Sequence, residues 1–275
     1  MSKVDLHIHT TASDGKFTPA EIVLKAAQAG LKYISICDHD SIEGVAPAQS
    51  AAVSYPEITV ISGVEINTDI PAGELHILGY FFDQNNSELK QTLSRLRNSR
   101  VERAQKIIQK LRKIGIKVDF VRVEELAGDG SIGRPHIAQA MLEKGYVNSF
   151  REAFIKYINR DGPAYVERDK ITPVEAIQII TRAGGLPILA HPLTLSRFEI
   201  AVGELKPAGL VGIEVYYNNY APEQIRNLLD LAEKFSLIST VGSDYHGLDS
   251  MNDPPLGTVE VPLEAAERLI ALSRR

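Results

Sequence analysis

The chain has 275 residues, of which 44% are hydrophobic and 24% are charged, an ordinary globular composition with ample length for a buried core. It contains no apolar run of about eighteen residues that could cross a membrane, and its N-terminus, MSKVDLHIHT, lacks the apolar stretch of a secretory signal. The net charge of −5 argues against a general nucleic-acid-binding protein. The single cysteine, Cys37, excludes an internal disulfide and fits a reducing cytoplasm. We expect Cys37 to be a buried core residue.

Seven short segments rich in Val, Ile, Leu and Tyr are predicted to be buried strands. In chain order they are VDLHIHT (4–10), YISICDH (33–39), TVISGVEIN (59–67), ELHILGYFF (74–82), LPILAHP (186–192), GIEVYY (212–217) and ISTVGSDYH (238–246). Helical patterns separate most of them, and three of these have proline in the first turn: 19–30, 172–185 and 221–236. This alternation predicts parallel strands, right-handed crossovers and an α/β fold, a distorted (β/α)₇ TIM-like barrel one unit short of eight.

The alternation breaks once, between residues 82 and 186, where helix signals dominate. Apolar residues recur there at helical spacing: Leu93, Leu96, Ala104, Ile107, Ile108, Leu111 and Ile114. Further helices are predicted at PHIAQAMLEKG and SFREAFIKYI. We therefore expect residues 84–168 to form a mostly helical insertion that caps the active site, on a barrel made of residues 1–83 and 169–275.

The first part of this insertion is strongly basic. Residues 90–113 hold nine Lys or Arg and one acid, Glu102, so this segment carries +8 and the remainder of the chain −13. Such an asymmetry fits an anionic partner such as an RNA tail. It fits a solvated helix face equally well, and the sequence leaves both interpretations open.

Histidines gather at one end of the predicted barrel. Five of the seven lie at or near the C-terminal ends of predicted strands: His7, His9, His39, His191 and His246. His76 lies within the fourth strand, and His136 lies outside the strands. Carboxylates accompany them, namely Asp14, Asp38, Asp40, Glu65, Glu214 and Asp244. Because side chains alternate along a strand, His7 and His9 point to the same side of theirs.

So many titratable side chains at one rim require a compensating partner, because burying them unpaired is costly. A lone buried histidine is usually a hydrogen-bonded core residue, but six at one rim with matching carboxylates predict a cluster of metal ions. Mixed imidazole and carboxylate ligands suit Mn²⁺, Fe²⁺ or Zn²⁺. The sequence contains no GxSxG motif for a serine nucleophile.

The motifs occur in a specific order: HIH followed by Asp14, then DHD, GVE, ELHILGY, AHP and GSDYHG. This order resembles the PHP (polymerase and histidinol phosphatase) superfamily from residue 4 to about 250. GRPHIA, inside the insertion, narrows the resemblance to bacterial metal-dependent phosphoesterases. That branch includes nucleoside 3′,5′-bisphosphate phosphatases and 5′-to-3′ exoribonucleases acting on short RNA.

The resemblance implies two or three divalent metal ions, with Mn²⁺ as the first choice and Zn²⁺ or Fe²⁺ as alternatives. The implied ligands of the first ion are His7, His9, Glu65 and Asp244. Those of the second ion are Glu65, as a bridge, with His76 and His191. Those of the third ion are Asp14, His39 and His246. Some superfamily members have histidine at the position of Asp14, so the occupancy of the third site is open.

The expected reaction is in-line attack on phosphorus by a metal-activated hydroxide, because metal binding brings the pKa of water close to neutrality. Pro135 suits the first turn of a helix, so Arg134 stands at a helix N-terminus, where anions bind. We assign Arg134 and His136 to the substrate phosphate; the alternative is a surface arginine before an ordinary helix. Asp40 is a candidate base or sugar contact, and a structural role is the alternative.

The resemblance leaves several substrates open. The leading interpretation is hydrolysis of phosphate monoesters of nucleotides, above all nucleoside 3′,5′-bisphosphates. The alternative is 5′-to-3′ trimming of short RNA; histidinol phosphate fits the basic insertion less well. A non-catalytic metal-binding or polymerase-associated module is the competing class, and intact ligands at every motif position argue against it. We expect neither a membrane nor an obligatory protein partner.

Overall fold

The computed structural model describes residues 3–70, 73–128, 130–168, 170–248, 255–259 and 262–274. Seven strands form one sheet in sequence order. They are β1 (Val4–Ile8), β2 (Tyr33–Ile36), β3 (Thr59–Ile70), β4 (Gly73–Tyr80), β5 (Leu186–Leu189), β6 (Gly212–Tyr217) and β7 (Ile238–Gly242). A parallel bridge between Ile8 and Tyr245 joins the two edges, so the sheet is nearly closed. The predicted seven-stranded, TIM-like α/β barrel is confirmed.

The expectation that all strands run parallel is wrong at β4, which is antiparallel to both of its neighbours. β4 pairs with β3 along its whole length, from Gly63 opposite Tyr80 to Ile70 opposite Gly73. Only residues 71 and 72 separate the two strands, whereas a parallel crossover requires about a dozen residues. The short spacing between the predicted strands 59–67 and 74–82 already indicated an antiparallel pair.

Helices cover the outside of the barrel. Thr18 and Thr172 cap α1 and α7, accepting hydrogen bonds from the backbone N–H of the glutamates three residues later. The barrel helices are α1 (Pro19–Gln28), α2 (Val45–Ala52), α7 (Pro173–Arg182), α8 (Phe198–Leu205), α9 (Pro222–Lys234) and α10 (Glu264–Ser273). Of these, α2, α8 and α10 were not predicted from the sequence. In the described ranges, none of the helices is long and apolar enough to cross a bilayer.

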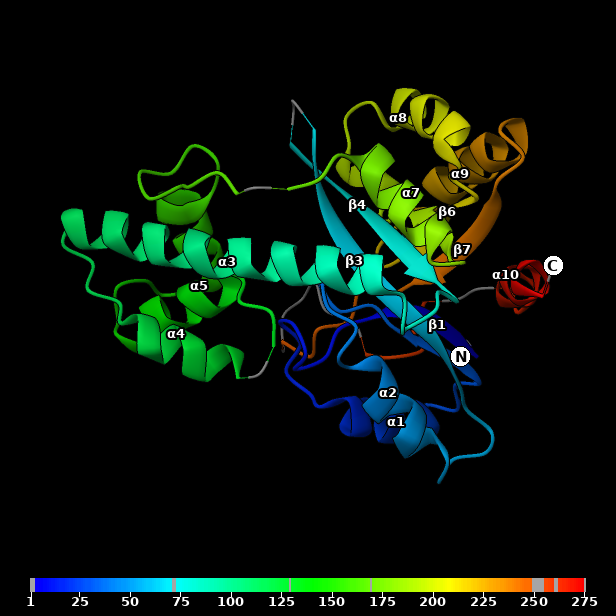
Figure 1. Ribbon diagram of the computed structural model, residues 1–275, viewed down its shortest axis with the longest axis horizontal. Coiled ribbons are helices and arrows are strands. Elements are labelled where there is room, and N and C mark those ends of the chain that lie inside the picture. Colours follow the sequence, from blue (N-terminus) through cyan, green and yellow to red (C-terminus); the bar gives the residue numbers. More distant parts are fainter. Residues whose placement is uncertain are drawn as a thin grey trace.

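A helical segment between β4 and α7 projects from the barrel (Figure 1). It comprises α3 (Ser87–Lys113), α4 (Phe120–Ala127), α5 (Arg134–Glu143) and α6 (Phe150–Ala153), which continues into a π-helical turn (Phe154–Ile158). Its buried apolar residues form a cluster of their own between Ala104 and Ala164. The first turns of α3 pack on the barrel instead, with Leu89 and Leu93 in the main core. One long helix therefore joins both parts.

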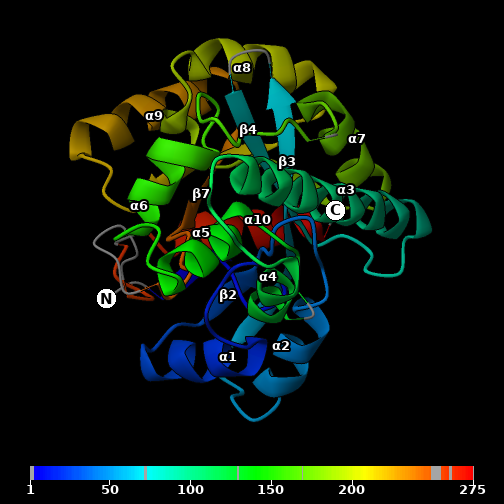
Figure 2. The same ribbon diagram turned by 90° about the vertical axis from the view of Figure 1, so that its left-hand side faces the viewer.

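The direction of β4 explains the length of α3. Tyr80, at the end of β4, pairs with Gly63 and Leu186, near the beginnings of the adjoining strand segments. The 27 residues of α3 span about 40 Å and return the chain to the end of the barrel at which β1 and β2 finish. Figure 2 shows α4, α5 and α6 in front of the strands at this end. The helical segment thus covers the mouth of the barrel.

Cys37 lies in the barrel core, as expected. Its side chain is fully buried, and its thiol donates a hydrogen bond to the carbonyl of Leu6 at 3.2 Å. Burial raises the pKa of the thiol to about 12. A thiol with such a pKa is protonated at neutral pH and is a poor nucleophile.

Candidate metal centre and active site

The nine residues predicted as metal ligands come together at the mouth of the barrel, and we call them the metal rim. Three lie within strands: His7 in β1, Glu65 in β3 and His76 in β4. The other six lie in the segments that follow strands: His9, Asp14, His39, His191, Asp244 and His246. His76 reaches the rim because it pairs with Asn67, two residues beyond Glu65 on the neighbouring strand.

The first group consists of His7, His9, Glu65 and Asp244, whose ligand atoms all lie within 4.8 Å of one another. The Nε2 atoms of the two histidines are 3.2 Å apart. His9 Nε2 is 3.0 Å from Asp244 Oδ1 and 3.4 Å from Glu65 Oε2. His7 Nε2 is 3.5 Å from the same Glu65 oxygen. Four potential ligand atoms therefore surround one point.

The second group centres on the other oxygen of Glu65. Oε1 lies 2.8 Å from His76 Nδ1 and 3.1 Å from His191 Nε2, and these two nitrogens are 3.2 Å apart. His39 Nδ1 approaches Glu65 Oε2 at 2.8 Å, so His39 also joins Glu65 and His76 in one group of close ligand atoms. Glu65 thus has one oxygen in each of two neighbouring groups, the position of a bridging carboxylate.

The third group comprises Asp14, His39 and His246, together with His9, which the sequence analysis had placed only in the first group. Asp14 Oδ1 lies 3.5 Å from His246 Nε2 and 3.9 Å from His9 Nδ1. Asp14 Oδ2 lies 3.9 Å from His39 Nε2. His9 and His39 each direct one ring nitrogen at Asp14 and the other at Glu65, so the three groups are contiguous.

Several buried atoms of the rim have no hydrogen-bond partner within the described ranges: His9 Nδ1, Asp14 Oδ1, His39 Nδ1 and Glu65 Oε2. His39 Nδ1 and Glu65 Oε2 are close but are not oriented as a hydrogen bond. An unpartnered buried polar atom costs about 1–3 kcal/mol, and convergent nitrogen and oxygen atoms are what divalent cations bind. The rim therefore fits metal ions of the Mn²⁺, Fe²⁺ and Zn²⁺ type.

The protonation states agree with this fit. Burial would raise the pKa of Asp14, Glu65 and Asp244, but the surrounding imidazoles hold each pKa well below its usual range. Burial, with a contribution from the charge of His246, lowers the pKa of His9 to about 3. The carboxylates are thus ionised and His9 is neutral, as metal coordination requires. Burial would lower the pKa of His7, His76 and His246, but the neighbouring carboxylates raise it, so a bound metal ion would displace protons from these three imidazoles.

Strained backbone marks the same place. His191 and Asp244 have positive φ angles of 25° and 56°, and Asp40 has a φ of 52°. Non-glycine residues adopt this region at a cost of about 1–3 kcal/mol. Among the described residues, Phe81, Asn219 and Ser236 also have positive φ angles, so half of the six such residues lie at or beside the rim. The backbone strain at His191, Asp244 and Asp40 thus occurs in the segments that follow strands at the rim.

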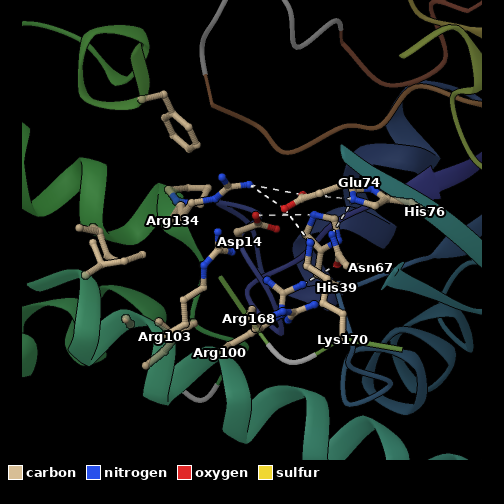
Figure 3. Close-up of a pocket in the computed structure, with 17 residues that line it drawn as sticks. Asp14, His39, Asn67, Glu74, His76, Arg100, Arg103, Arg134, Arg168 and Lys170 are labelled. Atoms are coloured by element: carbon tan, nitrogen blue, oxygen red, sulfur yellow. Dashed lines mark hydrogen bonds and ion pairs between the residues drawn. The ribbon is translucent and has the colours of Figure 1, made fainter. Parts of the chain in front are cut away.

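A cavity of 150 Å³ extends from the rim toward the helical segment (Figure 3). A water needs about 15 Å³ of such volume, so the cavity has room for roughly ten waters or one small phosphorylated group. Asp14, His39 and His76 line its barrel side. Among the described residues, five cationic side chains also line it, and we call them the cationic wall: Arg100, Arg103, Arg134, Arg168 and Lys170.

Comparison with known proteins identifies the family. The family model of the PHP domain matches residues 5–159, more than half of the chain. This chain belongs to the PHP family. The 5′-3′ exoribonuclease of Haemophilus influenzae is 35% identical to it over 248 residues, which cover 89% of this chain and 90% of the relative. The 3′,5′-nucleoside bisphosphate phosphatase of Chromobacterium violaceum is 30% identical over 251 residues, with coverages of 90% and 88%.

A solved structure gives the same answer for the fold. A Bifidobacterium adolescentis protein assigned as a metal-dependent phosphoesterase superposes with a TM-score of 0.89 at 27% identity, covering 98% of this chain and 95% of that one. The resemblance stated from the motifs is therefore confirmed. This PHP protein is a metal-dependent phosphoesterase, an enzyme that hydrolyses phosphoric esters.

Glu214 holds two histidines of the metal rim in place. One oxygen lies 3.1 Å from His7 Nδ1, and the other accepts a hydrogen bond from the backbone N–H of His191 at 2.7 Å. Such a carboxylate fixes the orientation of a ligand histidine and increases its basicity. Gly242 makes room for it, because a Cβ there would lie 2.2 Å from the Glu214 carboxylate. Glu214 was expected among the carboxylates near the strand ends, but this supporting role was not predicted from the sequence.

Asp38 holds the loop that carries Asp14. Its two oxygens accept hydrogen bonds from the backbone N–H and the hydroxyl of Thr10 and from the hydroxyl of Ser13, each at 2.7 Å. The side chain is buried, and burial raises its pKa despite these three donors. Asp38 therefore positions the segment after β1 and does not face the rim.

Arg134 and His136 lie in the first turn of α5, but only Arg134 lines the cavity at the rim, and His136 lines a second cavity. Arg134 lines the cavity, and its Nη2 approaches the two oxygens of Glu74 at 3.3 and 3.4 Å. His136 Nδ1 accepts a hydrogen bond from the backbone N–H of Gly133 at 3.0 Å. Burial lowers the pKa of His136, so the neutral ring carries its proton on Nε2 and can donate it.

Asp40 lies behind the cationic wall. Its Oδ2 accepts hydrogen bonds from Arg100 Nε at 2.7 Å and from Arg168 Nη1 at 2.9 Å. Burial would raise the pKa of Asp40, but these two guanidinium groups lower it to about 2. A carboxylate with this pKa is a weak base, so the geometry favours a role in positioning the arginines.

Most of the cationic wall has no distinguishing pattern in the sequence. Arg100 and Arg103 belong to the basic segment 90–113, which gave a signal without distinguishing them from its other basic residues. Arg168 and Lys170 lie where the chain returns to the barrel, with no local pattern to mark them. Only the folded cap brings these residues to the rim.

Proposed function

We propose that this phosphoesterase hydrolyses phosphate monoesters of nucleotides, with nucleoside 3′,5′-bisphosphates as its substrates. One observation carries the proposal: three residues of the metal rim, Asp14, His39 and His76, line the same cavity as the five side chains of the cationic wall. A metal centre alone suffices for one phosphate, whereas a further set of arginines beside it suits a ligand with more than one anionic group. The bisphosphate phosphatase activity named for the Chromobacterium violaceum relative supports the same substrate class.

We infer that the rim binds two or three divalent ions, with Mn²⁺ as the first choice. His7, His9, Glu65 and Asp244 are the proposed ligands of the first ion. Glu65, His76 and His191 are those of the second, and Asp14, His39 and His246 are those of the third. Ions bound here would lower the pKa of water and neutralise charge on the phosphoryl oxygens.

The residues of the cap complete the proposed chemistry. Arg134 lines the cavity of the cationic wall and His136 lines a second cavity, and Asp14 of the rim lines both. We assign both side chains to the phosphate that is hydrolysed, beside Asp14: the guanidinium pairs with its oxygens, and His136 donates the proton on Nε2. Glu74, which contacts Arg134, Lys170 and His76, keeps the arginine directed toward the rim. Asp40 positions Arg100 and Arg168 in the same way.

The proposal also includes the division of the chain into cap and barrel and the location of the protein in the cell. Residues 84–168 form the cap, and residues 1–83 with 169–275 form the barrel; the separate apolar cluster of the helical segment supports this division. A cytoplasmic location remains a prediction, supported by the single cysteine of the chain.

A second function, 5′-to-3′ cleavage of short RNA, is favoured by a second cavity. It lies on the other side of Pro135 and shares Asp14 with the first one. Its lining is more apolar and includes Leu126, Phe150 and Gln139, side chains that suit a nucleoside. An RNA substrate could place one nucleotide on each side of the rim, in line with the exoribonuclease named for the Haemophilus influenzae relative.

The first experiment is a product-release panel on purified, Mn²⁺-loaded protein. Its substrates are 3′,5′-bisphosphoadenosine, AMP, histidinol phosphate and a 5′-phosphorylated RNA trimer. Fast phosphate release from the bisphosphate, with little mononucleotide from the trimer, supports the monoesterase. Stepwise release of mononucleotides makes RNA cleavage the main activity, and preference for histidinol phosphate contradicts the proposal.

Arg134→Ala tests the assignment of the reacting phosphate. A hydrogen bond to a charged group is worth about 1.5–3 kcal/mol, so kcat/KM should fall about 10- to 100-fold. Bound metal, measured by elemental analysis, should not change, because Arg134 contacts Glu74 and none of the nine rim residues directly. Wild-type kinetics in this variant would remove the assignment.

A further inference from the structure

One tyrosine contacts two residues of the metal rim and has no part in the proposed function. Tyr217 is the last residue of β6, and its hydroxyl donates a hydrogen bond to Asp244 Oδ2 at 2.8 Å. Its ring also lies roughly edge-on to the imidazole of His191, with the two ring centroids 5.8 Å apart. Asp244 is a proposed ligand of the first ion and His191 of the second, so Tyr217 contacts one ligand of each.

A β-bulge directs Tyr217 to this place. Side chains alternate along a strand, so Glu214 and Tyr217, three residues apart, would point to opposite faces of a regular β6. Glu214 pairs with Thr240 of β7. Tyr216, two residues further along β6, pairs with the very next residue of β7, Val241. Such a bulge re-aims a side chain and is common beside active sites, and here both Glu214 and Tyr217 contact rim residues.

The hydrogen bond from Tyr217 divides the two oxygens of Asp244. Oδ1 lies 3.0 Å from His9 Nε2 and 3.4 Å from His7 Nε2, so it faces the first ligand group. Oδ2 instead accepts the hydrogen bond from the tyrosine hydroxyl. A carboxylate can bind a cation through one oxygen or through both. With Oδ2 held by Tyr217, the oxygen directed at the rim is Oδ1.

The segment after β6 also supports the two rim residues with strained backbones. Asp244, with a φ of 56°, is held by Tyr217. His191, with a φ of 25°, begins a turn in which the backbone N–H of Leu193 donates to the hydroxyl of Tyr220 at 3.2 Å. The rings of the two tyrosines are 5.0 Å apart. Strained backbone persists only where its surroundings fix it, and these two side chains contribute to that.

We propose that Tyr217 is a positioning residue of the metal centre, whose hydroxyl fixes the rotation of the Asp244 carboxylate so that Oδ1 serves as its ligand atom. This inference rests on the metal ligation in the proposed function and adds a residue to it. Ligating carboxylates are oriented by their hydrogen-bond donors, just as ligating histidines are by their acceptors. Catalytic metal sites keep a coordination position open, and a carboxylate that offers one oxygen occupies fewer positions than one that offers two.

The test is Tyr217→Phe, which removes the hydroxyl and keeps the ring beside His191. The Mn²⁺ affinity of metal-depleted protein is measured by competition with a chelator of known affinity, and it should fall about 10- to 100-fold. The visible absorption spectrum of the Co²⁺-loaded variant should also differ from that of wild type, because the band intensities depend on the number and arrangement of ligand atoms. Both measurements are independent of turnover.

Tyr216→Phe is the matched control. Tyr216 lies next to Tyr217 in the same strand and is half-buried as well, but it packs against the apolar core. This variant should keep the wild-type Mn²⁺ affinity and Co²⁺ spectrum. Wild-type affinity in Tyr217→Phe would overturn the proposal. A weaker affinity with an unchanged Co²⁺ spectrum, or an equal loss in Tyr216→Phe, would also overturn it, because Tyr217 would then have only a structural role.

These measurements separate the inference from the proposed function. Wild-type protein that binds Mn²⁺ but releases no phosphate from nucleotides contradicts the proposed substrate, and the comparison of affinities still decides on Tyr217. Wild-type protein that binds no divalent ion contradicts the metal ligation and this inference with it. At saturating Mn²⁺, KM for the bisphosphate in Tyr217→Phe should equal the wild-type value, because Tyr217 does not line the cavity. A raised KM would make Tyr217 a substrate contact and overturn its role as a positioning residue.

Discussion

The metal rim and the cationic wall face one cavity but are built in opposite ways. The rim offers lone pairs of imidazole and carboxylate groups, contributed by strands and loops from His7 to His246. The wall offers N–H donors, contributed by α3, α5 and residues 168 and 170. The first set binds cations and the second binds anions. In the proposed function the rim therefore carries out the reaction, and the wall selects which phosphate ester reacts.

The supports of the two regions differ as well. Behind the rim, Asp5, Asp38 and Glu214 are buried carboxylates that accept hydrogen bonds from the backbone of the barrel. Three of the five wall residues, Arg100, Arg103 and Arg134, instead come from helices of the cap. Arg100, Arg134 and Arg168 pair with the barrel carboxylates Asp40 and Glu74. Changes behind the rim should therefore alter metal binding, and changes in the cap should alter substrate binding.

The largest expected effect is at Glu65. Glu65→Gln keeps the shape of the side chain but removes the charge that two ligand groups share. Metal electrostatics contribute several kcal/mol to such a reaction, so kcat should fall about 10³-fold or more. Steady-state kinetics and elemental analysis measure activity and metal content together. The exposed Glu223→Gln on α9 is the control, and wild-type kcat in Glu65→Gln would separate the rim from catalysis.

A smaller effect is expected one layer behind the rim. Glu214→Gln weakens the hydrogen bond to His7, and the loss of such a partner costs about 10- to 100-fold in metal affinity. Titrating the chelated variant with Mn²⁺ should shift the activation curve by this factor while activity at saturating metal largely returns. Low activity that Mn²⁺ does not restore would mean that Glu214 acts on substrate.

The two regions were also unequally visible in the sequence. Rim ligands stand at predicted strand ends, where parallel topology gathers them, and the two-residue spacing of His7 and His9 places both on one side. Arg168 belongs to no periodic pattern, because its place depends on how the cap folds back on the barrel. The reversal of β4 was missed although the spacing before Glu74 was too short for a crossover. The rim could be predicted because strand order and the alternation of side chains follow from local sequence patterns. The wall could not, because its residues come together only through tertiary packing.

Leu111→Ala tests whether the cap can be destabilised while the metal rim keeps its structure. Leu111 is fully buried in the apolar cluster of the cap, and Leu-to-Ala changes at such sites cost about 2–5 kcal/mol of unfolding free energy. Denaturant unfolding should show this loss, while hydrogen exchange becomes faster in α4 and α5. Metal content should stay at the wild-type value and KM for the bisphosphate should rise. A loss of metal would mean that cap and rim form one cooperative unit.

The smallest effect is expected on the outer face of α3. Arg95 and Lys113 are exposed and 18 residues apart, five full turns, so they share one stripe of the helix. Arg100 and Arg103 lie on a different face, toward the cavity. Replacing both Arg95 and Lys113 by Gln should therefore change cleavage of the RNA trimer less than about twofold and leave its salt dependence unaltered. Each contact with a single-strand phosphate would add about 0.7 to the slope of log kcat/KM against log salt. If the variant lowers the slope by that amount for each residue replaced, the anion-binding surface extends from the cavity along the outside of the cap. The basic segment 90–113 would then be a track for RNA.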